Sequence, residues 1–306
     1  MPTGRQGSIH LFRYKGIDVF LHWSWFLIAV FEIKARAGTY TSIAWNVLEY
    51  LALFCIVLMH EFGHALACRQ VGGVADHIVL WPLGGVAYVD PPPRPGATLW
   101  SIAAGPLVNV ALFPILFVLY AMSKGLGWAA TNPNAAQLLY SLLWIDGTLL
   151  VFNILPIFPL DGGQILRALL WFPLGRARSL MVATLLGFLG IAAFLFFAFR
   201  SGSLWIGALA IFMLLNCWGG LKHSFFLLKL AKLPRRAGFE CPVCKTAAPL
   251  GNLWRCSNCA TSFDTFATQG QCPSCAARFA GTRCLDCGRM SPVSEWYATA
   301  PEVIKA

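Results

Sequence analysis

Charged residues are scarce in this sequence. Only 12% of the 306 residues are charged and 58% are hydrophobic, whereas soluble domains are about 25% charged. This composition excludes an ordinary soluble globular chain and indicates a polytopic membrane protein. The net charge of +10 is compatible with nucleic-acid binding, but much of the excess flanks apolar segments, where Lys and Arg meet anionic lipid.

Six apolar stretches have about the 20 residues that a transmembrane helix needs, or nearly so. Lys and Arg collect in every second connecting segment, so the positive-inside rule places both termini in the cytoplasm and makes the second span run inward. The predicted fold class is an α-helical polytopic membrane protein of about six transmembrane helices, located in the cell membrane. The expected spans are residues 18–33, 43–68, 99–121, 136–157, 179–199 and 203–228.

The second apolar stretch contains the motif His60-Glu61-Phe62-Gly63-His64. Histidines four residues apart share one helix face, so both imidazoles can bind one Zn²⁺ while the glutamate between them reaches a water. A chance match is the alternative, but these side chains inside a membrane helix are costly unless they are paired or bind a metal. The motif therefore predicts His60 and His64 as ligands of a catalytic zinc and Glu61 as the catalytic base.

The fourth apolar stretch ends in a segment that leads to Asp161-Gly162-Gly163. Pro156 and Pro159 interrupt its helical hydrogen bonds, and irregular backbone at membrane depth is tolerated where it lines a cavity or is buried in protein. Asp161 is expected at the depth of the two histidines, and we predict that it is the third zinc ligand. The alternative is a helix N-cap role. A rival zinc site completed by a downstream glutamate has only Glu240, Glu295 and Glu302 available.

Four further polar residues lie in or beside the apolar segments. Asn153 and Asn109 are candidates for contact with the substrate or an oxyanion, and a packing hydrogen bond is the alternative for each. For His22, the residues alone indicate a hydrogen-bonded histidine at the membrane interface. Asp146, in the middle of the fourth span, needs a polar partner or water, and the sequence does not identify that partner.

A β-hairpin is expected between the second and third spans. Two β-prone runs in residues 77–90 flank Pro82-Leu83-Gly84-Gly85, which is a turn pattern. The exposed edge of such a hairpin could hold a substrate peptide as an added strand. An interfacial loop with apolar anchors is the alternative.

The composition changes abruptly after residue 236. Four CxxC pairs follow, and two such pairs complete one four-cysteine zinc site. Disulfides are the alternative, but they are rare in the reducing cytoplasm. We predict a membrane metalloprotease domain over residues 1–236, a double zinc ribbon over 237–290 and a C-terminal tail over 291–306. The expected structural zinc ligands are Cys241, Cys244, Cys256, Cys259, Cys272, Cys275, Cys284 and Cys287.

Arginines interleave with aromatic residues in this ribbon region. Arg255, Arg278, Arg283 and Arg289 alternate with Trp254, Phe263, Phe266 and Phe279. Such a pattern can form a nucleic-acid face or a protein-docking surface. Tethering to the membrane favours docking of a cytoplasmic protein over nucleic acid.

Together these motifs resemble the site-2 protease family of intramembrane metalloproteases, over about residues 8–230. The resemblance rests on His60-Glu61-Phe62-Gly63-His64, on Gly105-Pro106-x-x-Asn109, and on Asn153-x-x-Pro156 leading to Leu160-Asp161-Gly162-Gly163. It implies that His60, His64 and Asp161 bind catalytic zinc, that Glu61 is the general base, and that the substrate is the transmembrane segment of another protein. It also suggests a role in regulated intramembrane proteolysis. His22 resembles the histidine near the first helix of compact six-helix members of this family, which makes it a candidate for contact with the substrate or an oxyanion.

A non-catalytic membrane adaptor that binds partners through its ribbons is the alternative function. The two hypotheses differ in zinc content: three ions per chain for the protease, one catalytic and two structural, and two ions for the adaptor.

Overall fold

The computed structural model describes residues 7–81 and 84–296. They divide into two compact units, the first ending at Leu221 and the second beginning at Lys222. The division falls within the last long helix, ahead of the boundary expected at residue 236, and residues 297–306 of the expected tail lie outside the described part. The helices are α1 (Ser24–Ala35), α2 (Ile43–Gln70), α3 (Pro95–Gly125), α4 (Trp128–Thr131), α5 (Pro133–Ile154), α6 (Asp161–Ser201) and α7 (Leu204–Ala231).

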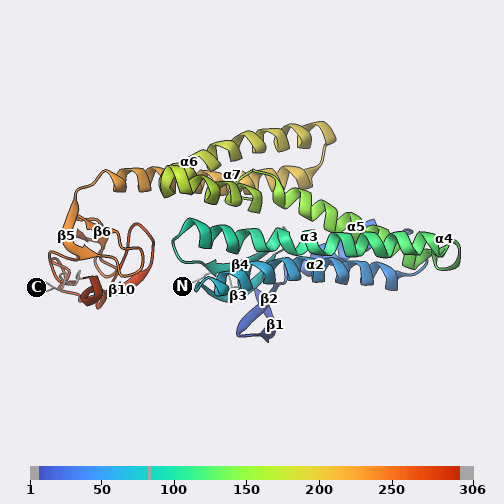
Figure 1. Ribbon diagram of the computed structural model, residues 1–306, viewed down its shortest axis with the longest axis horizontal. Helices are drawn as coiled ribbons and strands as arrows, with labels where there is room; N and C mark the ends of the chain where they lie inside the picture. The colour runs from blue at the N-terminus through green and yellow to red at the C-terminus, as the bar shows by residue number, and fades with distance from the viewer. Residues whose placement is uncertain (1–6, 82–83, 297–306) are drawn as a thin grey trace, which may run out of the picture. The chain divides into compact units, whose positions relative to one another are not determined.

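Five of these helices, α2, α3, α5, α6 and α7, are long and apolar enough to cross a membrane, by the described residues. They correspond to five of the six expected spans, and the chain is a multi-pass membrane protein. In Figure 1, α2 and α3 run alongside one another. α6 merges two helices across Gly175, whose φ of 76° is not helical.

A four-stranded sheet belongs to the same unit, with strand order β1-β2-β3-β4. β2 pairs parallel with β3, and the other two pairings are antiparallel. The β3–β4 hairpin is the expected one, although its turn residues Pro82 and Leu83 lie outside the described part. The sequence did not predict β1 and β2. The strands are β1 (Ser8–Tyr14), β2 (Ile17–His22), β3 (Val74–Trp81) and β4 (Gly84–Asp90).

The first expected span, residues 18–33, is therefore not one continuous helix. Its first part is strand β2, because pairing with β1 and β3 satisfies that backbone, and only the 12 residues of α1 are helical. Three hydrogen bonds trace its path along α2: Arg69 to the Gly16 carbonyl, Tyr50 to that of Trp25, and Asn46 to that of Arg36.

These three contacts mean that residues 16–36 run antiparallel to α2 from Arg69 to Asn46. Because an α-helix rises about 1.5 Å per residue, this path is about 35 Å long. A hydrocarbon core is about 30 Å thick. The strand and the helix together thus cover the length of a membrane crossing.

A buried apolar cluster of this unit lies between the sheet and α2. Buried residues of β2 and β3 pack against the α2 side chains Ala65 and Cys68, and Trp25 and Val57 extend the same cluster. Burial of this apolar surface is the main force that fixes the sheet on the helix that carries the HExxH motif.

The second unit contains short strands and four knuckles, the tight turns formed by the four CxxC pairs. Its buried core contains Trp254, Phe266 and Trp296 together with Cys241 and Cys284. Ion pairs join Arg235 to Asp286 at 2.7 Å and Arg236 to Asp264 at 2.5 Å. The strands are β5 (Arg235–Glu240), β6 (Ala247–Pro249), β7 (Trp254–Arg255), β8 (Ser262–Phe263), β9 (Gly281–Arg283) and β10 (Met290–Pro292), followed by the 3-10 helix Val293–Trp296.

Candidate metal centres

Two histidines and one aspartate from distant helices meet inside the first unit. His60 and His64 lie on α2, each 6% exposed, and their Nε2 atoms are 3.1 Å apart. Asp161 Oδ2 lies 3.0 Å from His60 Nε2 and 3.3 Å from His64 Nε2. Because the ligand atoms of a tetrahedral zinc ion, about 2.0–2.1 Å from the metal, are separated by about 3.3 Å, the three atoms fit the ligand set of one zinc ion.

Asp161 is the first residue of α6, and the N-cap position is occupied by Leu160, which makes no side-chain cap hydrogen bond. The alternative in which Asp161 caps the helix is thus not observed. Its carboxylate points instead at the two histidines (3.0 and 3.3 Å). A negative charge in the first turn also interacts favourably with the helix dipole.

The second ring nitrogen of each histidine is hydrogen-bonded to α3. His60 Nδ1 lies 2.6 Å from Asn109 Oδ1, and His64 Nδ1 lies 2.9 Å from the Ser101 carbonyl oxygen. Since an oxygen can only accept here, each Nδ1 carries the proton, and the lone pair of each Nε2 is available to bind a metal ion. A Cβ atom at Gly105 would collide with both imidazoles, so glycine permits this close approach of α2 and α3.

Glu61 is 6% exposed and lies between the two histidines in the sequence. Its Oε2 accepts a hydrogen bond of 2.8 Å from the backbone N–H of Ala87 on β4. A Cβ atom at Gly85 would lie 2.5 Å from Glu61 Oε1. The edge strand β4 therefore lies directly against the glutamate that the motif singles out.

The three remaining candidates occupy different places. The side chain of Asn109 is fully buried and joins His60 to Asp146. Asn153 lies in the last turn of α5 and has no side-chain hydrogen bond among the described residues. His22 ends β2, shares a hydrogen bond with the Ser24 hydroxyl, and stacks on Trp81 with 4.1 Å between ring centroids.

Sequence reasoning missed two partners of the site and left the partner of a third residue, Asp146, open. The Ser101 carbonyl and the Ala87 N–H are backbone groups, which carry no sequence signal. Asp146 was visible as an intramembrane acid, and its partner is now identified: Asp146 Oδ1 accepts a hydrogen bond of 2.7 Å from Asn109 Nδ2.

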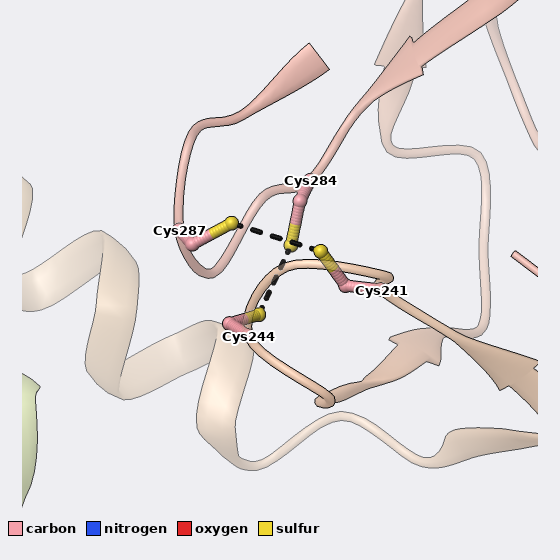
Figure 2. Close-up of side chains that lie close together, drawn as sticks. All are labelled: Cys241, Cys244, Cys284 and Cys287. Carbon is pink, nitrogen blue, oxygen red and sulfur yellow. Dashed lines mark hydrogen bonds between the residues drawn. The ribbon is translucent and has the colours of Figure 1, made fainter. Parts of the chain in front are cut away.

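The eight tail cysteines form two groups of four. The pairing is nested, which means that the first CxxC knuckle shares a group with the fourth and the second shares a group with the third. Cys241 and Cys244 face Cys287 and Cys284, with Sγ–Sγ distances of 3.7 and 3.8 Å (Figure 2). The two middle knuckles form the other group, with distances of 3.6 Å for Cys256–Cys275 and Cys259–Cys272. Thiolates about 2.3 Å from a tetrahedral zinc are about 3.8 Å apart, so both groups fit a four-cysteine zinc site.

Hydrogen bonds stabilise the thiolate form of two of these cysteines. The hydrogen bond with Cys284 lowers the pKa of Cys244, and the hydrogen bond with the Thr261 hydroxyl lowers the pKa of Cys259. The thiolate is the form that ligates metal.

The aromatic residues of the ribbons do not form an exposed face. Trp254, Phe263 and Phe266 are 8%, 4% and 5% exposed, and Phe279 stacks on Phe263. The Nε groups of Arg255 and Arg283 donate to the carbonyls of Ala260 and Gly288 within their knuckles. Bases cannot stack on buried rings, so these aromatic residues serve the core.

Comparisons with known proteins agree with this geometry. The model of peptidase family M50 matches residues 49–133 and 127–197, which include His60, His64 and Asp161. Zinc metalloprotease MJ0392 of Methanocaldococcus jannaschii is 38% identical over 180 residues, which cover 59% of this chain and 50% of that protein. Putative zinc metalloprotease Rip3 of Mycobacterium tuberculosis is 30% identical over 209 residues, 61% of this chain and 52% of that protein.

The chain thus spans about half the length of these curated relatives. Among solved structures, the site-2 protease from Methanocaldococcus jannaschii matches with a TM-score of 0.51 and 29% identity, covering 70% of this chain and 95% of that one. On sequence and on fold alike, the chain belongs to peptidase family M50, the family of the site-2 proteases.

Proposed function

We propose that this protein is an intramembrane zinc metalloprotease that hydrolyses a peptide bond in or near a transmembrane segment of a membrane protein. The observation that carries this proposal is the meeting of His60, His64 and Asp161 beside Glu61, on helices α2 and α6 that are long enough to cross a bilayer. The zinc metalloproteases among its relatives support the same chemistry.

His60, His64 and Asp161 would hold the catalytic zinc. Their donor set of two imidazoles and a carboxylate, the separations of 3.0 to 3.3 Å and the hydrogen bonds behind both imidazoles suit this ion. A zinc ion held there would polarise the scissile carbonyl and lower the pKa of a water to about 7.

Glu61 would move the protons of the reaction. Its carboxylate accepts a proton from the attacking water and later delivers it to the departing amine. The hydrogen bond from the Ala87 N–H (2.8 Å) holds one carboxylate oxygen in place and leaves the other for this transfer.

The outer edge of β4 would bind the substrate as an extended strand. β4 ends the sheet, and an edge strand offers unpaired backbone groups to another chain. Because the peptide bonds of a helix are already hydrogen-bonded, a helical substrate must be opened before attack. Pairing with β4 would do so next to Glu61.

The proposal also covers the orientation of the chain in the membrane and the role of the cysteine-rich tail. Both termini would face the cytoplasm, because the Gly16–Arg69 contact brings the N-terminal strands to the inward end of α2 and the basic segments favour that side. The tail would hold two structural zinc ions and dock a cytoplasmic protein, or recruit substrate, in regulated intramembrane proteolysis.

Cleavage by the purified full chain in vesicles tests the proposal, with a membrane-spanning reporter as substrate. We expect Glu61→Gln to keep its zinc content and to lower the cleavage rate by at least about 100-fold. Glu32→Gln makes the same chemical change on α1, away from the histidines, and serves as the matched control. Turnover retained in Glu61→Gln would refute the mechanism.

The adaptor alternative predicts a different result. An adaptor would hold two zinc ions, both in the tail, and His60→Ala/His64→Ala would leave the zinc content unchanged. The protease would hold three and lose one. Deletion of residues 239–306 tests the tail separately: an unchanged cleavage rate and substrate choice would exclude its role in substrate recruitment.

A further inference from the structure

A buried chain of polar groups leads from α5 to the candidate metal centre. Asp146 on α5 and Asn109 on α3 are both 0% exposed. Asn109 Nδ2 donates to Asp146 Oδ1 at 2.7 Å, and Asn109 Oδ1 accepts from His60 Nδ1 at 2.6 Å. Asp146 thus reaches a histidine of the centre through one intervening amide.

The hydrogen bonds between Asp146, Asn109 and His60 run in one direction. An asparagine side chain can present either its oxygen or its NH₂ group to a neighbour, whereas a carboxylate only accepts hydrogen bonds. Asp146 therefore requires the NH₂ end of Asn109, and this leaves the amide oxygen for His60. An oxygen at His60 Nδ1 requires the proton on Nδ1, so Nε2 keeps its lone pair.

Packing alone does not explain an acid at this position. Asp146 Oδ2 has no hydrogen-bond partner among the described residues, and a buried acceptor without a partner destabilises a fold. A leucine of similar volume would avoid this desolvation cost, so the acid at residue 146 calls for a reason other than stability.

We infer that Asp146 is a positioning residue for the metal centre: through Asn109 it holds His60 in the tautomer whose Nε2 binds a metal ion. This inference rests on the proposed function, because it assumes that a metal binds His60. In the reverse orientation of Asn109, His60 Nε2 carries the proton and cannot act as a ligand.

The test is zinc affinity, measured on the full-length protein by chelator competition with zinc alone as the probe. His60→Ala/His64→Ala gives the tail's contribution, and subtraction leaves the zinc held at the histidines. Since loss of an outer-shell partner typically costs 10–100-fold in metal affinity, we expect Asp146→Leu to weaken this zinc by about that factor. Asp146→Asn keeps an acceptor of the same shape. Its zinc affinity should stay within about threefold of the wild-type value, because the new amide has two orientations and only one of them accepts from Asn109.

Two further measurements separate positioning from a structural role. Asn109→Leu should weaken zinc by a similar factor, and adding Asp146→Leu to it should cost no more than about twofold, because Asp146 acts through Asn109. In the metal-free protein, ¹⁵N NMR of the histidines should report the Nδ1–H tautomer of His60 in the wild type and in Asp146→Asn. Asp146→Leu should show a mixture of tautomers.

The outcomes are distinguishable. Wild-type protein that holds no more zinc than His60→Ala/His64→Ala would refute the proposed function itself. If the wild-type protein holds this zinc, two results would overturn only the role of Asp146. One is a zinc affinity of Asp146→Leu within about twofold of wild type, and the other is additive losses of affinity when Asp146→Leu is combined with Asn109→Leu. A cooperative melting transition and an unchanged tail zinc content in Asp146→Leu and Asp146→Asn establish that the variants are folded.

Discussion

Asp161 Oδ2 lies 3.0 Å from His60 Nε2, although 101 residues separate the two in the sequence. The contact joins the first residue of α6 to the middle of α2. Both groups are largely buried, with side-chain exposures of 15% and 7%. Burying a carboxylate and two imidazoles in an apolar unit costs free energy that a shared metal ion would offset. The first prediction tests that metal ion.

Replacement of Asp161 by Asn should remove the zinc ion at the histidines and abolish cleavage, because two imidazoles alone leave the ligand set incomplete. Loss of a direct ligand should exceed the 10–100-fold effect of an outer-shell partner, so we expect affinity to fall by more than about 100-fold. Metal analysis of purified protein measures this as one zinc fewer per chain. Asp76→Asn, on the exposed side of β3, is the matched control, and equal zinc content in both variants would contradict the assignment.

Substitution of Gly85 by Ala should damage catalysis without removing zinc. The added Cβ atom would lie 2.5 Å from Glu61 Oε1, so the carboxylate must leave its position beside the Ala87 N–H. A displacement of about 1 Å in a catalytic group can cost about 100-fold in rate, and we expect kcat to fall at least tenfold. Gly125→Ala, where a Cβ atom meets nothing within 4 Å, should behave as wild type. Zinc lost together with activity would show that the substitution disturbs the ligands instead.

The zinc content of cysteine variants tests the nested pairing of the cysteine knuckles. Cys241→Ser and Cys287→Ser affect the same site, so each single variant and the double variant should all lose one zinc. Cys241→Ser combined with Cys256→Ser should lose two, because these cysteines belong to different groups. If consecutive knuckles shared a site, the Cys241/Cys256 variant would lose only one. Each loss should also destabilise the tail, since metal binding supplies much of the folding energy of such small modules.

Replacement of Arg69 by Lys should destabilise the first unit. The Arg69 guanidinium donates to the carbonyl oxygens of Lys15, Gly16 and Ala75, and so ties the β1–β2 turn and the start of β3 to the end of α2. An ammonium group cannot make these bonds in the same geometry, and we expect a loss of about 1–3 kcal/mol. The melting temperature in detergent should fall relative to Arg200→Lys, a change at an exposed position in the last turn of α6. An equal melting temperature would show that the tie contributes nothing.

The local motifs were within reach of sequence reasoning. Helical periodicity places His60 and His64 on one face in any helix, and a CxxC pair has the same knuckle geometry wherever it occurs. The long apolar runs likewise require helices that cross a membrane. Residues 18–33 were the exception: they were expected to be a helix, but residues 17–22 form strand β2 between β1, which is nearby in the sequence, and β3, which lies more than 50 positions away.

The sequence by itself determined the chemical groups of this protein: two histidines and a glutamate on one helix, an aspartate after a proline-broken segment, and eight tail cysteines. It also predicted that Asp161 joins both histidines, which the structure places 3.0 and 3.3 Å from its carboxylate. Only the tertiary structure decided the other partners, namely the outer knuckles against each other and Asp146 behind Asn109. The physical reason is that a hydrogen bond or a shared ligand site depends on distance in space, which packing of remote segments sets. Backbone donors such as the Ala87 N–H are identical in nearly every residue, so their use has no mark in the sequence.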